Sequence, residues 1–278
     1  MKLEKLFIGL LLVVCFVSCS KDDEPGNGGD PGKNPNQPEN NSSVTINPDG
    51  STSTKAVFSP IDETTFYIDY VKYQIVDSHL EIIGYDPFEL KGDVKPYASV
   101  KYLGTTYNTR IINSEAFRNC KTITSINIPS SITKISNYAF SGCSSLASVT
   151  IPSSVTTIGY YAFGGCSSLT GVTIPSSVTE IGYYAFGGCS SLTSVTIPSS
   201  VTRICNSAFY NCLELLDIYI GTRPYVFSVV DSYWAPIYDT WGPICDNATL
   251  HVKAENLEWF KSHREWSKFK NIVGDYNP

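Results

Sequence analysis

Residues 144–166 read SSLASVTIPSSVTTIGYYAFGGC, and residues 167–189 read SSLTGVTIPSSVTEIGYYAFGGC. The two stretches differ at three positions only. Five cysteines recur at the same constant interval along the chain: Cys120, Cys143, Cys166, Cys189 and Cys212. A unit of this length cannot bury its own apolar face, so neighbouring units must stack to form a core. The sequence therefore predicts an array of small, nearly identical units.

Each unit repeats its apolar residues at fixed offsets. In the first quoted unit they are Leu146, Val149, Ile151, Val155, Ile158, Ala162, Phe163 and Cys166. The Leu-x-x-Val-x-Ile spacing ends with period two, which predicts one short strand per unit. Pro152 ends that strand because proline has no N–H for a continuing ladder. Gly159, Gly164 and Gly165 then predict a tight return with a helical turn rather than a long helix.

This unit resembles the leucine-rich repeat, and specifically its 23-residue BspA-like subtype with the core C-x-x-L-x-x-V-x-I-P-x-x-V-x-x-I-x-x-x-A-F. The match runs over four full units, residues 121–212, with a degenerate unit on each side. Atypical end units are expected because each has one face without a neighbour. The resemblance implies an α+β solenoid, a right-handed coil over residues 113–220 with one short strand per unit. The repeat motif is highly specific for this fold, but it is only weak evidence for a function.

The flanking regions predict two caps for the stack. Residues 65–112 alternate aromatic or aliphatic residues with polar ones, which predicts several short strands. A β-rich amino-terminal cap is therefore expected over residues 44–112. Residues 221–278 begin with an irregular aromatic segment. A last strand at residues 248–252 follows, and then a loose helical stripe over residues 254–272 predicts a short helical carboxy-terminal cap.

The amino-terminus carries a targeting signal. Two lysines precede an apolar run over residues 6–17, which predicts a signal peptide over residues 1–18 because the run is too short and wrongly flanked for a spanning helix. The sequence FVSC at residues 16–19 resembles a bacterial lipobox, which implies cleavage and acylation at Cys19. Ordinary signal peptidase cleavage nearby is the alternative. Residues 19–43 then form an acidic, Gly/Pro/Asn-rich tether that cannot build a core.

The acidic run at the start of the tether bears on location. Asp22, Asp23 and Glu24 resemble the export signal of lipoproteins that some Gram-negative bacteria move to the outer face of the outer membrane. A solvated linker patch is the alternative interpretation. The expectation is an outer membrane lipoprotein exposed at the cell surface, which meets the membrane only through its lipid anchor.

Composition narrows the function classes. The chain has 20 basic and 26 acidic side chains, a net charge of −6, which becomes −7 when the expected signal peptide is removed. This disfavours nucleic acid and anionic lipid as partners. The three histidines, His79, His251 and His263, have no metal-ligand partner at helical or hairpin spacing, and the common catalytic motifs are absent. We predict a protein without enzymatic activity, cofactor or metal.

The regularly spaced cysteines, which we call the cysteine ladder, occupy an apolar position of the unit. Free cysteine behaves as a small buried hydrophobe, so the prediction is a core role, and a buried thiol is chemically inert. Cys205 and Cys245 lie off the ladder. They could form one bridge in an oxidising compartment, although nothing in the sequence fixes their distance.

Three surfaces are candidates for binding a partner. The first is made of the outward residues of the repeat strands, expected to line a concave sheet: Ser125, Asn127, Ser148, Thr150, Gly171, Thr173, Ser194, Thr196, Asp217 and Tyr219. Their hydroxyl groups can bind a polypeptide or a glycan, but serine and threonine are also ordinary solvated strand residues. The second is a tyrosine row, Tyr138, Tyr161 and Tyr184, which is expected to stack as a packed ladder if it is not a binding surface.

The third candidate is the aromatic segment at residues 221–247, which interrupts the repeat. Its candidate ligand contacts are aromatic: Tyr233, Trp234, Tyr238 and Trp241. Such residues suit contact with a sugar or a peptide. The alternative is that the segment packs on the last strand as part of the carboxy-terminal cap.

The BspA-like resemblance implies a secreted adhesin or receptor, since such proteins are associated with attachment to host extracellular proteins and to other bacterial cells. The expected function is therefore a non-catalytic cell-surface binding protein that recognises a host or bacterial surface protein. Two alternatives stay open. One is a glycan-capture lipoprotein of a polysaccharide uptake system, with the aromatic segment as its platform. The other is an architectural surface protein without a ligand.

Overall fold

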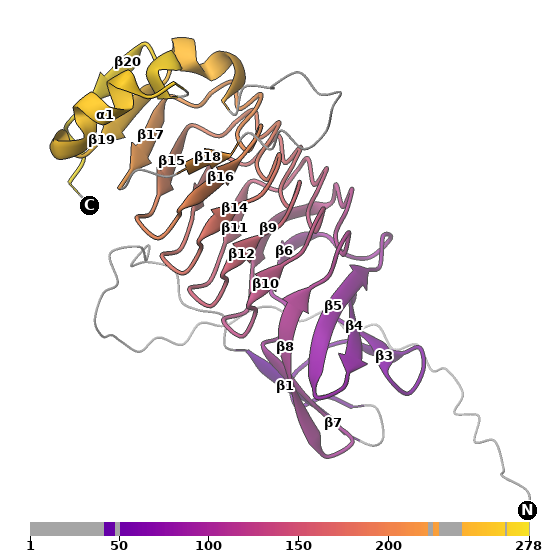
Figure 1. Cartoon of the computed structure of the whole chain (residues 1–278). Helices are drawn as coiled ribbons and strands as arrows, with labels where there is room; N and C mark the ends of the chain where they lie inside the picture. Colours follow the sequence, from indigo (N-terminus) through magenta and orange to yellow (C-terminus); the bar gives the residue numbers. More distant parts are fainter. Residues whose placement is uncertain (1–41, 48–50, 222–224, 228–240, 265, 278) are drawn as a thin grey trace, which may run out of the picture.

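The computed structural model shows a solenoid of stacked coils between a β-rich amino-terminal region and a carboxy-terminal region that carries the helices (Figure 1). The described residues are 42–47, 51–221, 225–227, 241–264 and 266–277. The expected signal peptide, the acylation site Cys19 and nearly all of the tether lie outside these residues. Within them, no helix is long and apolar enough to cross a membrane.

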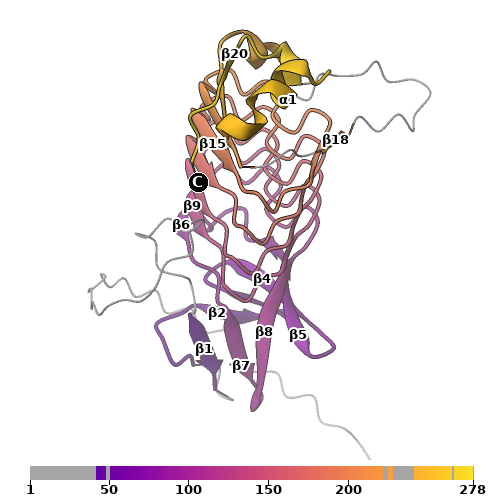
Figure 2. The same ribbon diagram turned by 60° about the vertical axis from the view of Figure 1, so that its left-hand side comes forward.

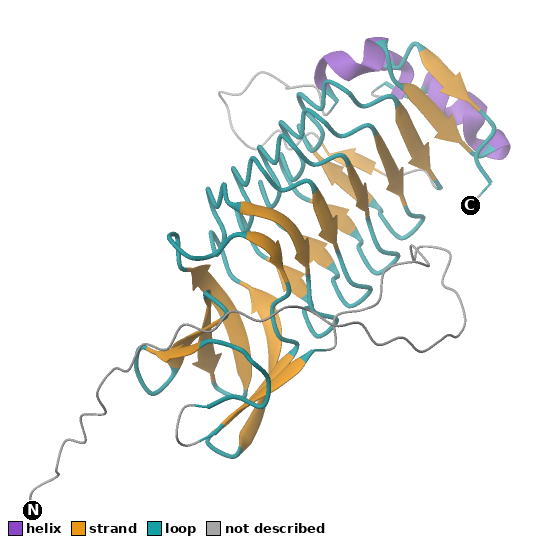
Figure 3. Ribbon diagram, turned by 180° about the vertical axis from the view of Figure 1, so that it is seen from behind, coloured by secondary structure: helices purple, strands orange, loops and turns teal. Residues whose placement is uncertain are grey.

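Two sheets run along the solenoid on opposite sides of its core (Figure 2). Sheet 1 consists of parallel pairs in the order β6 (Gly92–Val94), β9 (Ile123–Asn127), β11 (Ser148–Thr150), β13 (Gly171–Thr173), β15 (Ser194–Ile197), β17 (Asp217–Ile220), β19 (Thr249–Val252) and β20 (Asn271–Val273). Figure 3 shows these strands side by side from the amino-terminal region to the helices.

Sheet 2 joins the amino-terminal region to the other side of every coil. Its main path is β2 (Phe58–Pro60), β3 (Thr65–Ile68), β4 (Val71–Val76), β5 (His79–Tyr85), β8 (Thr105–Ile112), β10 (Lys134–Ile135), β12 (Thr157–Ile158), β14 (Glu180–Ile181), β16 (Arg203–Cys205) and β18 (Tyr225–Phe227). Off this path, β7 (Ser99–Tyr102) pairs with β8 and with β1 (Ser43–Ile46). The pairs are antiparallel from β2 to β5 and parallel from β5 to β18, so the amino-terminal hairpins lead directly into the solenoid.

The predicted leucine-rich repeat solenoid with its two caps is confirmed, but each coil differs from the expected unit in one detail. A second strand of two or three residues follows the strand-ending proline, as at β12. In that strand Thr157 is exposed and Ile158 is buried. Two residues of alternation are too short to be recognised as a strand by periodicity, which explains why only one strand per unit was expected.

The return from sheet 2 to sheet 1 is held by a third ladder of hydrogen bonds between coils. The N–H groups of Tyr138, Phe140 and Gly142 donate to carbonyl groups of the next coil at 2.7–2.8 Å. Tyr138 with φ 59° and Gly142 with φ 74° both lie in the left-handed region. The N–H groups that pair with the next coil belong to every second residue, Tyr138, Phe140 and Gly142. The return therefore runs through successive turns, and no helical turn forms in the described repeats.

The core repeats one layer per coil. The phenylalanine rings stack with centroids 5.1–5.5 Å apart and planes within 8°, in the series Phe117, Phe140, Phe163, Phe186 and Phe209. Tyr85 covers the first ring at 6.0 Å. Each ring is fully buried, so both of its faces contact another aromatic ring instead of water.

The ladder cysteines are buried and free, which confirms their predicted core role. The Sγ atoms of Cys143, Cys166, Cys189 and Cys212 each donate to a phenylalanine carbonyl of an adjacent coil at 3.0–3.3 Å. Burial raises the pKa of Cys166 to about 12, so the thiol stays protonated and unreactive. Cys205 and Cys245 are also buried and neither is in a disulfide, so the bridge between them that the sequence left open does not form.

The carboxy-terminal cap closes the last coil. It contains the short helices η1 (Gly242–Asp246), η2 (Ala254–Asn256), α1 (Leu257–Ser262) and η3 (Trp266–Lys268). Trp241, Phe260, Trp266 and Phe269 are buried in this cap and pack on one another at ring distances of 5.3–6.2 Å. These aromatic rings replace the neighbouring coil that the end of the stack lacks.

Candidate functional site

Four neighbouring strands of sheet 1 present a surface rich in hydroxyl groups, which we call the hydroxyl face. It consists of two outward positions on each of β9, β11, β13 and β15: Ser125, Asn127, Ser148, Thr150, Gly171, Thr173, Ser194 and Thr196. These residues are exposed or half-buried, whereas the residue between each pair is buried. Parallel register sets equivalent residues side by side, about 4.8 Å apart. The structure thus brings together the strand residues that the sequence predicted.

The hydroxyl face is uncharged, and it meets carboxylates at both ends. At one end Asp93 on β6 accepts hydrogen bonds from Ser125 Oγ at 2.7 Å and Thr124 Oγ1 at 3.1 Å. These two bonds lower the pKa of the Asp93 carboxyl. At the other end the same two rows continue on β17 as Asp217 and Tyr219. Among the described outward residues from β9 to β17 there is no lysine or arginine.

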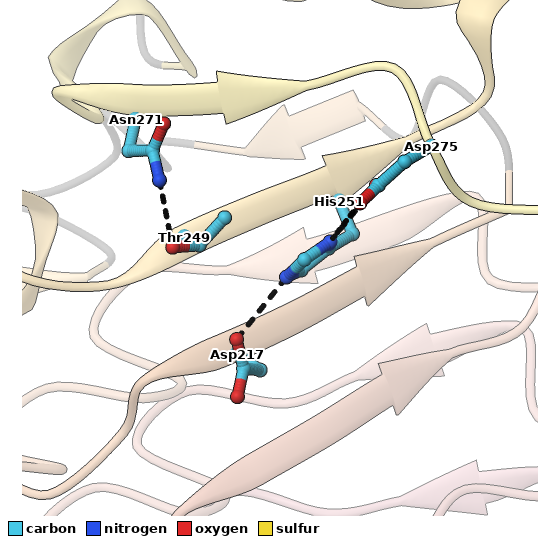
Figure 4. A network of polar contacts seen from close by, with 5 residues as sticks. All are labelled: Asp217, Thr249, His251, Asn271 and Asp275. Carbon is cyan, nitrogen blue, oxygen red and sulfur yellow. Dashed lines mark hydrogen bonds and ion pairs between the residues drawn. The ribbon is translucent and has the colours of Figure 1, made fainter.

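A polar and aromatic cluster, which we call the acid–aromatic corner, lies where β17 meets the carboxy-terminal cap. It consists of Asp217, Tyr219, His251, Asp275 and Tyr276. The imidazole of His251 on β19 lies between two carboxylates from different elements (Figure 4). Its Nε2 is 3.1 Å from Asp217 Oδ1, and its Nδ1 is 2.9 Å from Asp275 Oδ1. A neutral imidazole has one N–H, so both ring nitrogens donate only when the ring is protonated.

The charge state of His251 follows from these contacts. Its partial burial would by itself lower the pKa, but the hydrogen bonds and negative charges of Asp275 and Asp217 outweigh that effect and raise it. A raised pKa means that the stabilisation is fully present below pH 6.5, the ordinary histidine value, and is lost as the pH rises through the folded-state pKa. The two carboxylates are 45% and 58% exposed, so each pair contributes at most about 1 kcal/mol.

We therefore predict that Asp275→Asn lowers the pKa of the His251 ring, because it removes one of the two charges that favour the imidazolium. The pH titration of the ring resonances by NMR measures this shift. Asp246→Asn is the matched control, since Asp246 is an exposed carboxylate of the same cap that pairs with Lys270 at 2.8 Å. An unchanged His251 pKa in Asp275→Asn would contradict the contact between the tail and β19.

The tyrosine row forms the packed ladder that was expected. Tyr138, Tyr161 and Tyr184 stack at 5.1 and 4.7 Å with planes within 10°. Arg118 covers the first ring at 5.4 Å, and Tyr210 meets the last ring edge-on at 6.1 Å. The ring faces are occupied by one another and by these two end residues. The row therefore offers no open aromatic face to a ligand.

The aromatic segment is described only in part. Tyr233, Trp234 and Tyr238 lie outside the described residues. Trp241 is fully buried and stacks on Phe209 at 5.0 Å and 4°, as the next ring of the phenylalanine ladder. The expectation that Trp241 contacts a ligand is therefore wrong, because packing on the open end of the stack removes the ring from solvent.

The sequence interpretation missed His251, Asp275 and Tyr276. The sequence did contain a signal for His251. Trp241 follows Phe209 at the same separation as His251 follows Tyr219, so the ring position and the strand position shift together. The last coil is therefore a lengthened repeat unit, which keeps the ring and the strand at their usual separation. A search at the fixed period of the other units could not find it. Asp275 and Tyr276 lie beyond the array and had no such signal.

A cavity of about 690 Å³ lies in the amino-terminal region beside the hydroxyl face. Asp93 borders both, and the cavity is also lined by Asp69, Glu89, Lys91 and Lys95. This mixture of acids and lysines gives it no single charge preference. In the described part of the chain, no three histidine, cysteine or acidic side chains are grouped so as to hold a metal ion.

Known proteins are similar to this chain in sequence and in fold. The family model of the BspA type leucine rich repeat region matches residues 97–228 in six copies. A leucine rich repeat protein of T. pallidum is 29% identical, with a TM-score of 0.49, and the match covers 54% of this chain and 68% of that one. A leucine rich cell surface protein from Faecalibacterium prausnitzii is 29% identical, with a TM-score of 0.50, over 73% of this chain and 53% of that one.

The pneumococcal vaccine antigen PcpA shares the fold, with a TM-score of 0.55 and 18% identity over 77% of this chain and 48% of that one. The chain thus spans about half the length of the last two proteins. No curated protein matches the sequence. Proteins of the leucine-rich repeat family are generally non-catalytic binding scaffolds. The repeated coils, their two parallel sheets and the six matched copies together identify residues 97–228 of this chain as a leucine-rich repeat region of the BspA type.

Proposed function

We propose that this chain is a non-catalytic cell-surface protein that binds an extracellular protein through the hydroxyl face. One observation carries the proposal: two rows of outward polar residues are held in register along parallel strands and stay uncharged from Ser125 to Thr196. Such a polar surface is well solvated when no partner is bound. It offers a polypeptide hydrogen-bond donors and acceptors at a regular spacing. The F. prausnitzii relative is itself described as a cell surface protein.

The proposal includes the location outside the cell. Acylation at Cys19 and the acidic tether would hold the solenoid away from the lipid head groups on the outer face of the outer membrane. Protease treatment of intact cells, against a lysed-cell control, tests this location. Release of the solenoid from intact cells is the expected result, and full protection would contradict a surface role.

For binding, we predict that Thr173→Arg in the full chain lowers attachment of cells to extracellular matrix proteins or partner bacteria at least tenfold. A long charged side chain in the middle of the hydroxyl face blocks close approach of a partner across several strands. Thr157→Arg is the matched control because Thr157 is an exposed strand threonine on the opposite side of the same solenoid, one coil away. Cell adhesion to immobilised proteins measures the effect, and equal attachment by wild type and Thr173→Arg cells would exclude this face.

A further inference from the structure

The surface of sheet 1 changes its chemistry abruptly between β15 and β17. The outward residues on β15 are Ser194 and Thr196, and their direct neighbours on β17 are Asp217 and Tyr219. Leu216, immediately before β17, is 53% exposed. A small, neutral surface therefore ends at an aromatic ring and a carboxylate, and buried aromatic anchors and charges are what usually dominate recognition energy.

The ring of Tyr219 leaves one face open at this boundary. Tyr219 and His251 are direct cross-strand neighbours, and their rings stack at 4.4 Å and 18°. The normal to the Tyr219 ring therefore points from strand to strand, with one face against His251 and the other toward β15. The neighbour on that side is the exposed Thr196, whose side chain is too short to cover an aromatic ring. Tyr276 adds only a tilted contact at 5.5 Å.

The charge beside this open face is negative. The acid–aromatic corner has two carboxylates against one imidazole, so its net charge is −1 even with His251 protonated. Asp217 uses Oδ1 for the histidine, and its side chain is 45% exposed. An exposed carboxylate next to an open tyrosine face suits a lysine or arginine, which can form an ion pair and a cation–π contact at once.

We propose that the acid–aromatic corner receives a lysine or arginine side chain of the extracellular protein that lies along the hydroxyl face. This inference rests on the proposed function and adds the chemistry of the partner. Charge complementarity favours a basic partner segment over the chain's own tether, which is acidic. The distance from β17 back to β9 is four strand spacings, about 19 Å, so the segment has about six extended residues on the uncharged side of its basic residue.

Acetylated heptapeptides, each with six serine and glycine residues and one variable terminal residue, test the inference against the full mature chain. That residue is lysine, arginine, glutamine or glutamate, and NMR chemical shifts of the backbone amides measure binding. The lysine and arginine peptides should shift the resonances of Thr196, Asp217 and Tyr219 and bind at least fivefold more tightly than the other two. Equal binding of the glutamate and lysine peptides, or shifts confined to other residues, would overturn the inference.

Three variants sharpen this test. Asp217→Asn keeps the shape of the side chain and should weaken the lysine peptide at least fivefold, and Tyr219→Ala should weaken it similarly. Glu214→Gln is the control, since Glu214 is an exposed acid of the same coil that precedes β17 and is not part of the sheet. Unchanged affinity in Asp217→Asn would refute the ion pair even if the peptide binds.

The outcomes separate this inference from the proposed function. If Thr173→Arg abolishes cell attachment while Asp217→Asn and Tyr219→Ala leave it unchanged, the hydroxyl face binds the partner and the basic anchor is wrong. If the lysine peptide binds at the corner while Thr173→Arg leaves attachment unchanged, the corner binds cations but the proposed use of the face fails.

Discussion

Replacing Phe163 with alanine should lower the free energy of unfolding by about 3–5 kcal/mol, the usual cost of deleting a buried aromatic ring. The ring is fully buried and stacks between Phe140 at 5.1 Å and Phe186 at 5.4 Å. Alanine would leave a cavity that breaks the ladder in the middle of the stack. The neighbouring coils cannot move together to fill this cavity. Their spacing is fixed by the hydrogen bonds of the two sheets and by those between successive turns.

Denaturant unfolding followed by circular dichroism measures this effect. Each coil contacts only its neighbours, so we expect a broader or split transition as well as a lower midpoint. Tyr160→Ala is the control in the same coil, since its ring is 46% exposed and should cost much less. A loss well under 1 kcal/mol for Phe163→Ala, far below the roughly 3–5 kcal/mol of a buried ring, would show that this ring is not a core residue.

The repeat sequence predicted the layers of the solenoid because one constraint acts on every coil. Leu146, Val149, Ile151 and Phe163 recur at a fixed period, and a residue that must touch its own equivalent in the next coil is visible as a repeat. The second strand also repeats, through Ile158, but the sequence did not show that this residue belongs to a strand. It is only two residues long at β12, and its existence depends on pairing with β10 and β14 rather than on local propensity.

The sequence predicted the part of the candidate site that lies in the regular repeats. It did not predict the part that lies beyond them. Ser148 and Thr150 face outward because they alternate with buried Val149, and alternation is a local property. His251 depends on a lengthened coil, and its partner Asp275 comes from a tail that only tertiary structure brings to β19. Sequence reasoning therefore located the hydroxyl face and missed the acid–aromatic corner.

The second large effect is expected at Trp241, which was predicted to bind a ligand and instead closes the core. Trp241→Ala should cost about 3–5 kcal/mol, because the indole stacks on Phe209 and also contacts Trp266 at 5.3 Å and Phe269 at 5.4 Å. Its removal would expose the last phenylalanine of the ladder and separate the cap from the coils. Thermal unfolding followed by near-ultraviolet circular dichroism measures the loss.

Trp241→Phe is the matched variant, because phenylalanine occupies the same position in the five preceding rings of the ladder. It should retain most of the stability that alanine loses, since a phenyl ring can still stack on Phe209. Glycan retention on affinity gels distinguishes the two roles of this residue. If both variants lost glycan retention but kept their stability, Trp241 would be a ligand-binding residue after all. A loss of stability in Trp241→Ala that Trp241→Phe largely restores would instead establish it as the last ring of the core.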